Sequence, residues 1–298
     1  MLGTCTGSLR RMDQAGTLQT LVGTLAGQGE RAALIALDRD ELKSFTYAEL
    51  ADLARRLAAG LHAKGLERGD HAILCATNSV PWVVACLALL QIGAIPVPLD
   101  TQASREDLAH ILEDSGARWA FVSSALASQV LQAQSAAGLH LVFLDEEARN
   151  EPDHWRHLLT QGGTDFRAIS PDDCAVIFYT SGTTGPPKGV PLTHRNLSSN
   201  IAALVALNIA RVDDRLLLPL PLHHVYPLVV GLLAPLALGV AVIIPYSLTG
   251  LHIQRALREG RATAILGVPR LYSALCGAIE QRISARGRIV WEIGRAHV

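Results

Sequence analysis

The stretch that decides the fold reads Tyr179-Thr180-Ser181-Gly182-Thr183-Thr184-Gly185-Pro186-Pro187-Lys188-Gly189-Val190. It follows an apolar run, residues 175–178, which is typical of a buried strand. Four Ser and Thr hydroxyl groups, several glycines and one lysine lie close together in this loop. Glycines let backbone N–H groups turn toward an anion, and open α/β sheets bind ligands at the carboxyl ends of their strands. The stretch therefore predicts a phosphate-binding loop.

The spacing of this loop excludes an ordinary P-loop. A Walker A loop reads G-x-x-x-x-G-K followed by Ser or Thr. Counted from Gly182, Pro187 stands at the second glycine position and Gly189 at the Ser or Thr position. A plain surface loop of Gly, Ser, Thr and Pro stays open as an alternative, and so does a merely solvated Lys188.

The composition predicts a large globular domain without a nucleic acid partner. The 298 residues are 49% apolar, so the chain can bury a sizeable core. Lys and Arg number 26 against 27 Asp and Glu, which leaves no net charge to attract a polyanion. The five cysteines are scattered without a C-x-x-C pair, so we expect reduced thiols and no zinc site. A cytoplasmic location follows, at most peripheral to the inner membrane.

Helical and strand-like segments alternate along the chain. Leucines at helical spacing, with Thr46 and Glu49 as a capping box, predict a helix over residues 48–64. A strand at 71–75, an apolar helix at 78–92 stopped by Gly93, and a strand at 94–97 then form a β-α-β unit. A helix at 104–114 and strands at 119–122, 141–144 and 175–179 follow. The prediction is an α/β fold of layered, mostly parallel sheets flanked by helices.

Two segments fall outside this rhythm. Residues 145–171 are polar and irregular, which predicts a surface connection. Residues 225–246 carry no charge and are long enough on paper to span a membrane, which leaves a membrane-anchored protein as one alternative. Interrupting prolines and glycines favour a buried helix followed by a strand at 240–244, so we expect no integral membrane span.

The loop also carries a family resemblance. Its Y-T-S-G-T-T-G-x-P-K-G-V pattern resembles the signature of the adenylate-forming superfamily, which includes acyl-CoA synthetases, luciferases and peptide-synthetase adenylation domains. Thr193-His194-x-Asn196-Leu197 and the run L-P-L-P-L-H-H at 218–224 also look like this family. The run G-V-P-R-L-Y at 267–272 is similar to its long-chain acyl-CoA synthetase branch. The resemblance implies the large N-terminal domain of such an enzyme.

The resemblance also implies a reaction and its residues. A carboxylate would attack the α-phosphorus of Mg-ATP to give acyl-AMP and pyrophosphate, and coenzyme A would then take the acyl group. Catalysis would fall to His224 and Lys188, while His223 and Tyr226 would shape the substrate pocket. The cofactor would be Mg²⁺, with no metal ligand assigned on this chain. The nucleotide-binding residues would be Thr180, Ser181, Gly182, Thr183, Thr184, Gly185 and Lys188. Apart from the resemblance, the uncharged aliphatic residues after His224 predict contact with a medium- or long-chain fatty acid, and the alternative is that they are simply core.

The later motifs of the family are not found, so we expect a truncated domain that does not turn over as it stands. A non-catalytic nucleotide- or acyl-binding fragment is the alternative function. The expected divisions are a flexible N-terminus at 1–16, an incomplete AMP-binding domain at 17–291 and an artefactual tail at 292–298. That tail, E-I-G-R-A-H-V, is also what a common sequencing-library adapter encodes.

Overall fold

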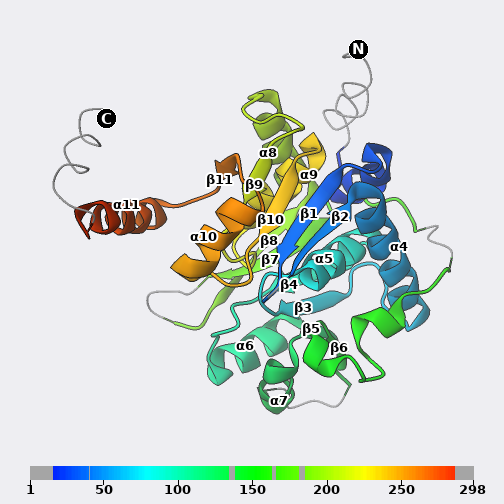
Figure 1. Cartoon of the computed structure of the whole chain (residues 1–298). Coiled ribbons are helices and arrows are strands. Elements are labelled where there is room, and N and C mark those ends of the chain that lie inside the picture. Colours follow the sequence, from blue (N-terminus) through cyan, green and yellow to red (C-terminus); the bar gives the residue numbers. More distant parts are fainter. Residues whose placement is uncertain (1–15, 40, 134–137, 163–165, 181–184, 286–298) are drawn as a thin grey trace.

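The computed structural model describes residues 16–39, 41–133, 138–162, 166–180 and 185–285 (Figure 1). Sheet A, in the upper part of Figure 1, has the strand order β11-β9-β10-β1-β2. Its strands are parallel except for β2, which is antiparallel to β1. The bounds are β1 Ala32–Leu37, β2 Leu42–Thr46, β9 Arg215–Leu217, β10 Ala241–Ile244 and β11 Ala264–Ile265.

Sheet B lies below sheet A in Figure 1 and has the order β4-β3-β5-β6, with every pair parallel. Its bounds are β3 His71–Cys75, β4 Ile95–Pro98, β5 Trp119–Val122 and β6 His140–Phe143. A further pair, β7 Cys174–Thr180 and β8 Lys188–Thr193, forms an antiparallel hairpin, and β7 packs beside β4. The predicted α/β fold of layered, mostly parallel sheets is confirmed.

Helices occupy three layers around the two sheets. Leu34 of β1 and Ala72 of β3 belong to one apolar core with the central helices, so those helices lie between the sheets. Outside sheet A, Ile35 packs with Ile253 of α10, and outside sheet B, Ile73 packs with α6 and α7. The central helices are α3 Leu18–Thr24, α4 Tyr47–Ala63, α5 Val80–Ile92, α8 His194–Ala206 and α9 Ala234–Leu238. The others are α6 Arg105–Ser115, α7 Ser124–Ala133, α10 Gly250–Glu259 and α11 Pro269–Ala285.

Helix α5 helps to explain why the central strands β3 and β10 show no alternating pattern. Every residue of α5 except Pro81 and Gln91 is buried, because the helix lies in the middle layer. A helix without a polar face needs apolar partners on all sides, and strands covered on both faces are apolar throughout. Ser79 caps the start of α5, and Gly93, in the left-handed conformation at φ 86°, ends it as the sequence predicts.

The remaining local predictions fall within one or two residues of the observed elements. Helix α4 begins at Tyr47, directly after its N-cap Thr46. The predicted capping box is present: the side chains of Thr46 and Glu49 each accept a hydrogen bond from the other's backbone N–H group. The uncharged segment 225–246 contains a π-helix, Pro227–Leu233 (η4), followed by α9 and β10. Among the described residues, no helix combines the length and the apolar character needed to cross a membrane.

The segment 145–171 is not merely a surface connection, and that prediction is wrong for its middle part. The short 3₁₀ helix η3, Trp155–Leu158, packs against α4 and buries Trp155 and Leu158. The backbone of Thr160 continues this contact by donating to the carbonyl of Arg56, 3.2 Å away. Helix η3 itself buries two large apolar side chains, which is too short a pattern to show a helical period.

A glycine in α4 makes this docking possible. A Cβ added at Gly60 would lie 1.7 Å from the carbonyl oxygen of Leu158, so no larger residue fits there without moving the backbone. Gly23 in α3 offers the opposite case, because a Cβ there would meet nothing within 4 Å.

Buried His194 ties the N-terminal helix to α8. Its Nδ1 accepts a hydrogen bond from the backbone N–H of Leu18, the first residue of α3, at 3.1 Å. The ring must be neutral to accept at Nδ1. The pKa of His194 is lowered to about 4, mainly by burial. The nearby Asp173 opposes this shift but does not cancel it. The bond therefore persists at neutral pH.

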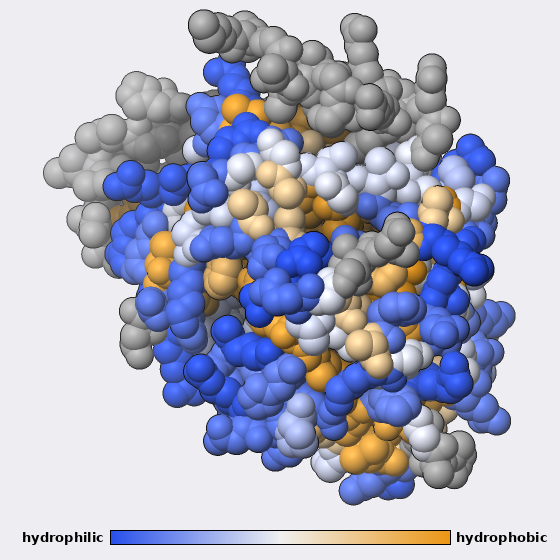
Figure 2. All heavy atoms as spheres, turned by 90° about the vertical axis from the view of Figure 1, so that its right-hand side faces the viewer, coloured by the Kyte–Doolittle hydropathy of each residue, from blue (hydrophilic) through white to orange (hydrophobic). Residues whose placement is uncertain are grey.

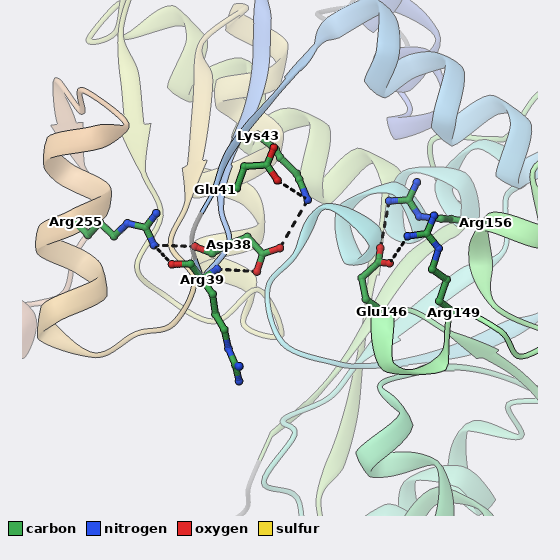
Figure 3. Close-up of polar contacts among 8 residues, drawn as sticks. All are labelled: Asp38, Arg39, Glu41, Lys43, Glu146, Arg149, Arg156 and Arg255. Atoms are coloured by element: carbon green, nitrogen blue, oxygen red, sulfur yellow. Dashed lines mark hydrogen bonds and ion pairs between the residues drawn. The ribbon is translucent and has the colours of Figure 1, made fainter.

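The face shown in Figure 2 is mostly hydrophilic. Polar and charged residues surround scattered apolar ones on the face shown in Figure 2. Figure 3 shows two groups of exposed contacts, in which Arg255 of α10 donates to the carbonyls of Asp38 and Arg39, and Glu146 pairs with Arg149 and Arg156. Exposed ion pairs contribute about 0–1 kcal/mol each, so the buried layers hold the fold.

The contact at Gly60 predicts opposite effects for matched glycine substitutions. Gly60→Ala should lower the free energy of unfolding by about 1–3 kcal/mol, because its methyl group overlaps a backbone carbonyl. Gly23→Ala should raise that free energy by about 0.5 kcal/mol, because alanine favours a helix over glycine and meets no obstacle. Urea denaturation measures both, and equal changes for the two variants would contradict the close approach at Gly60.

His194 predicts a stability loss in mild acid. The unfolded histidine takes up a proton near its ordinary pKa of 6.5, whereas the folded one resists until about pH 4. The unfolded state thus binds more protons in this window, so the free energy of unfolding falls as pH drops from about 6.5 to about 4. The loss is at most about 3 kcal/mol. His194→Gln keeps an acceptor without titrating and should show a shallower pH slope; identical slopes would refute the assignment.

Candidate functional site

The two ends of the predicted phosphate loop meet at the end of the β7–β8 hairpin. Thr180 is the cross-strand partner of Lys188, and its Oγ1 donates to the Lys188 carbonyl at 3.5 Å. Thr180, Gly185 and Lys188 are exposed. Ser181, Gly182, Thr183 and Thr184 lie outside the described residues. The described residues that flank the loop are therefore exposed, whereas the middle of β7 is buried.

The hairpin contains one strand that the sequence analysis predicted and one that it did not. The predicted strand at 175–179 is β7, and it pairs antiparallel with β8. A short connection can only turn the chain back on itself, because parallel neighbours need a long crossover. The sequence analysis missed β8, since it contains Gly189 and Pro191 and is exposed along most of its length.

The histidine pair lies in the turn between β9 and the π-helix. The ring centroids of His223 and His224 are 4.4 Å apart. His224 is exposed, whereas His223 is largely buried. The carbonyl of His224 accepts from the N–H of Leu228, so the pair is joined to the first turn of the π-helix. π-helical turns often occur at functional sites.

Asn78 holds this turn in place. Its side-chain Nδ2 donates to the carbonyl of Leu220 at 2.8 Å, and its Oδ1 accepts from the N–H of Leu222 at 2.9 Å. Asn78 directly precedes the cap of α5, whereas residues 218–224 extend from sheet A. One side chain thus links the end of sheet B to the histidine turn.

Asp100, which follows β4, faces the histidine pair from sheet B. Its Oδ2 lies 3.8 Å from Nε2 of His223, too far for a hydrogen bond but close enough for an ion pair if the ring is protonated. Burial lowers the pKa of His223, His224 lowers it further, and Asp100 opposes both. Burial and Asp100 also raise the pKa of the Cys75 thiol to about 12, so this thiol stays protonated.

Tyr226 and the residues after it divide between surface and core. The Tyr226 hydroxyl lies 3.5 Å from the carbonyl of Gly267, which brings the run at 267–272 beside the histidine turn. Val225 and Tyr226 are exposed. Leu228, Leu232 and Leu233, which the sequence assigned to acyl contact, are fully buried against protein. These three leucines therefore belong to the hydrophobic core.

The site residues form two groups. His223, His224 and Tyr226 lie together with Asp100 and Gly267, while Thr180, Gly185 and Lys188 lie at the hairpin tip. No hydrogen bond or ion pair between described residues joins the two groups. In the same described part of the chain, no group of three or more His, Cys, Asp or Glu residues could hold a metal ion.

Sequence reasoning missed Asp100 and the clamping role of Asn78. Asp100 ends the apolar run of β4 at the carboxyl edge of a parallel sheet, a position that could have marked it. For Asn78 the sequence carries a turn signal, but its partner lies 142 residues away at Leu220.

The chain matches known proteins over most of its length. A family model described as AMP-binding enzyme matches residues 23–290. A (7a-methyl-1,5-dioxo-octahydro-1H-inden-4-yl)propanoyl:CoA ligase of Mycobacterium tuberculosis is 34% identical over 83% of the chain and 50% of its own length. A feruloyl-CoA synthase of an Amycolatopsis species is 33% identical over 78% of the chain and 45% of its own.

Solved structures match the same region. A long-chain-fatty-acid-CoA ligase (FadD1) of Archaeoglobus fulgidus superposes with a TM-score of 0.78 at 26% identity. The match covers 90% of the chain and 54% of that protein. The chain thus spans about half the length of the curated relatives it matches.

The clamp predicts a specific loss for Asn78→Ala. Removing the amide leaves a carbonyl at Leu220 and an N–H at Leu222 without their partner, which should lower the free energy of unfolding by about 1–3 kcal/mol. Asn200→Ala is the matched control, because exposed Asn200 bonds only within its own helix α8 and should change stability by less than about 0.5 kcal/mol. Thermal or urea unfolding measures the loss in each variant. Similar losses of unfolding free energy in Asn78→Ala and Asn200→Ala would exclude the clamp.

Proposed function

The chain belongs to the AMP-binding enzyme family, and from that premise we propose that the protein containing it activates a carboxylic acid with ATP and transfers the acyl group to coenzyme A. A carboxylate oxygen attacks the α-phosphorus, and the bond to the β-phosphate breaks to release pyrophosphate. The coenzyme A thiol then attacks the acyl carbonyl, AMP leaves, and a thioester remains.

The β7–β8 hairpin is the observation that carries this proposal. Negative charge develops on the departing pyrophosphate, and hydroxyl groups, backbone amides and an ammonium group stabilise it when they are held in place beforehand. Exposed Thr180 and Lys188 stand opposite each other where the loop begins and ends. We assign nucleotide binding to Thr180, Ser181, Gly182, Thr183, Thr184, Gly185 and Lys188.

His224 is assigned to the reacting carboxylate. Its exposed ring can reach a bound molecule, whereas the ring of the largely buried His223 lies against it. A neutral His223 agrees with its lowered pKa, because burial disfavours the charged form of the ring. His223 and Tyr226 are assigned to the pocket entrance.

Magnesium is proposed to arrive with ATP. Mg²⁺ is usually held by substrate phosphates with one or two protein carboxylates. We therefore write the ion as part of the substrate, Mg-ATP, and assign it no ligand on this chain.

The acid is proposed to have an apolar body. Val225, Tyr226 and Val268 are exposed beside the histidine turn and carry no charge to pair with a polar acid. The similar proteins from Mycobacterium tuberculosis and Amycolatopsis act, by their names, on ring-bearing acyl groups. The proposed acid therefore has either a fatty chain or a ring as its apolar body.

Substitution at the loop tests the assignment. In the protein containing this chain, Thr183→Val with Lys188→Ala should slow pyrophosphate exchange by at least about tenfold, or about 1.4 kcal/mol of transition-state stabilisation. Lys43→Ala, an exposed lysine of β2, is the control and should leave the rate unchanged. The assay uses octanoate, palmitate, ferulate, acetate and phenylalanine in turn. An unchanged rate in the double variant refutes the loop assignment, and preference for acetate or phenylalanine refutes the apolar acid.

The alternative is a nucleotide- or acyl-binding protein without turnover. Calorimetric ATP binding that depends on Lys188, together with no pyrophosphate exchange for any acid, would favour that alternative. Exchange with at least one acid favours the ligase.

A further inference from the structure

Helix α6 contacts the hairpin immediately beside both ends of the loop. His110 Nε2 lies 2.9 Å from the carbonyl oxygen of Pro187, the residue before Lys188. The Tyr179 hydroxyl donates to Oδ2 of Asp114 at 2.6 Å, and Tyr179 directly precedes Thr180. His110 and Asp114 are one helical turn apart, so they lie on the same face of α6. One helix face therefore contacts both ends of the loop.

Gly189 leaves space for the ring of Tyr179. Tyr179 and Gly189 are cross-strand partners, so the tyrosine ring lies over the glycine. A Cβ at Gly189 would lie 3.1 Å from Cζ of Tyr179 and 3.3 Å from its hydroxyl oxygen. Contacts this close would push the ring away from Asp114. The missing side chain at Gly189 thus leaves room for the tyrosine ring in the position from which it reaches Asp114.

The donor of each bond can be identified. Burial and then Asp114 raise the pKa of Tyr179, so the phenol keeps its proton and donates to an ionised carboxylate. Hydrogen bonds to charged groups are shorter and stronger than neutral ones. A carbonyl oxygen can only accept, so His110 must donate from Nε2.

Helix α6 is a firm base for these contacts. Its opposite face buries Leu108, Ile111 and Leu112 against the outer side of sheet B. Ser104 caps its start by accepting from the N–H of Asp107, and left-handed Gly116 ends it. The loop ends are thereby positioned by sheet B through α6.

We propose that His110 and Asp114 are positioning residues for ATP, which hold the two ends of the phosphate loop at a set place; this inference rests on the proposed function. They act through Pro187 and Tyr179 and touch neither nucleotide nor acid. Small displacements of groups that bind a reacting phosphate cost large factors in rate. Removing the side chain of His110 or Asp114 should therefore raise KM for ATP while leaving KM for the acid nearly unchanged.

Kinetics on the intact protein provide the first test. His110→Phe and Asp114→Ala should each raise KM for ATP by at least about fivefold in pyrophosphate exchange, with KM for the acid within about twofold of wild type. Asp114→Asn and His110→Gln keep an acceptor and a donor and should restore most of the loss. Glu113→Ala is the matched control, because Glu113 is exposed on the same helix and should behave as wild type.

A double substitution tests whether Asp114 acts through the tyrosine. Tyr179→Phe and Asp114→Ala remove the same hydrogen bond. KM for ATP in the double variant should therefore be no higher than in the more impaired single variant. Additive losses overturn the proposal, and so do equal rises in KM for ATP and acid, which would indicate general loosening of the fold.

Hydrogen exchange separates this proposal from the proposed function. Without any nucleotide, the amides of residues 185–193 should exchange at least about fivefold faster in Asp114→Ala and His110→Phe than in Glu113→Ala. Unchanged exchange overturns the role of α6 even if the protein is a ligase. Faster exchange in a protein that activates no acid supports the hold on the loop and refutes the ligase assignment instead.

Discussion

The burial of α5 between two sheets is the constraint on which the rest of the structure depends. This helix has apolar side chains on every face, so it is stable only where protein covers all of them. Sheet A and sheet B provide that cover together with α4 and α3. Since each sheet must also be covered on its other side, α10 packs outside sheet A, and α6 and α7 pack outside sheet B.

The same arrangement places the functional groups. Asn78 stands at the start of α5, and its amide fixes the turn that carries His223 and His224. Asp100 leaves sheet B at the carboxyl end of β4 and faces that turn. The hairpin β7–β8 packs beside β4 on one side and against α6 on the other. Polar residues therefore extend from a rigid apolar framework, which is the arrangement that preorganised sites need.

Charge at the site is controlled by burial rather than by strong ion pairs. Burial keeps His223 neutral next to His224, and it keeps the Cys75 thiol protonated. Thr180 and Lys188 are exposed to solvent. Their hydroxyl and ammonium groups therefore carry no desolvation cost of folding in the free protein, and both are accessible to an anion. The surface pairs of Figure 3 add little to stability by comparison.

The sequence by itself determined the elements whose signal is local. Helical spacing and a capping box located α4, Ser79 and Gly93 bounded α5, and the Thr- and Gly-rich run marked the loop, because each depends on residues a few positions apart. Tertiary structure decided the antiparallel pairing of β8, the burial of Trp155, the facing of Asp100 and His223, and the contact of α6 with Pro187 and Tyr179. These contacts join residues far apart in the chain, and no local period encodes which distant group will fill the space beside them.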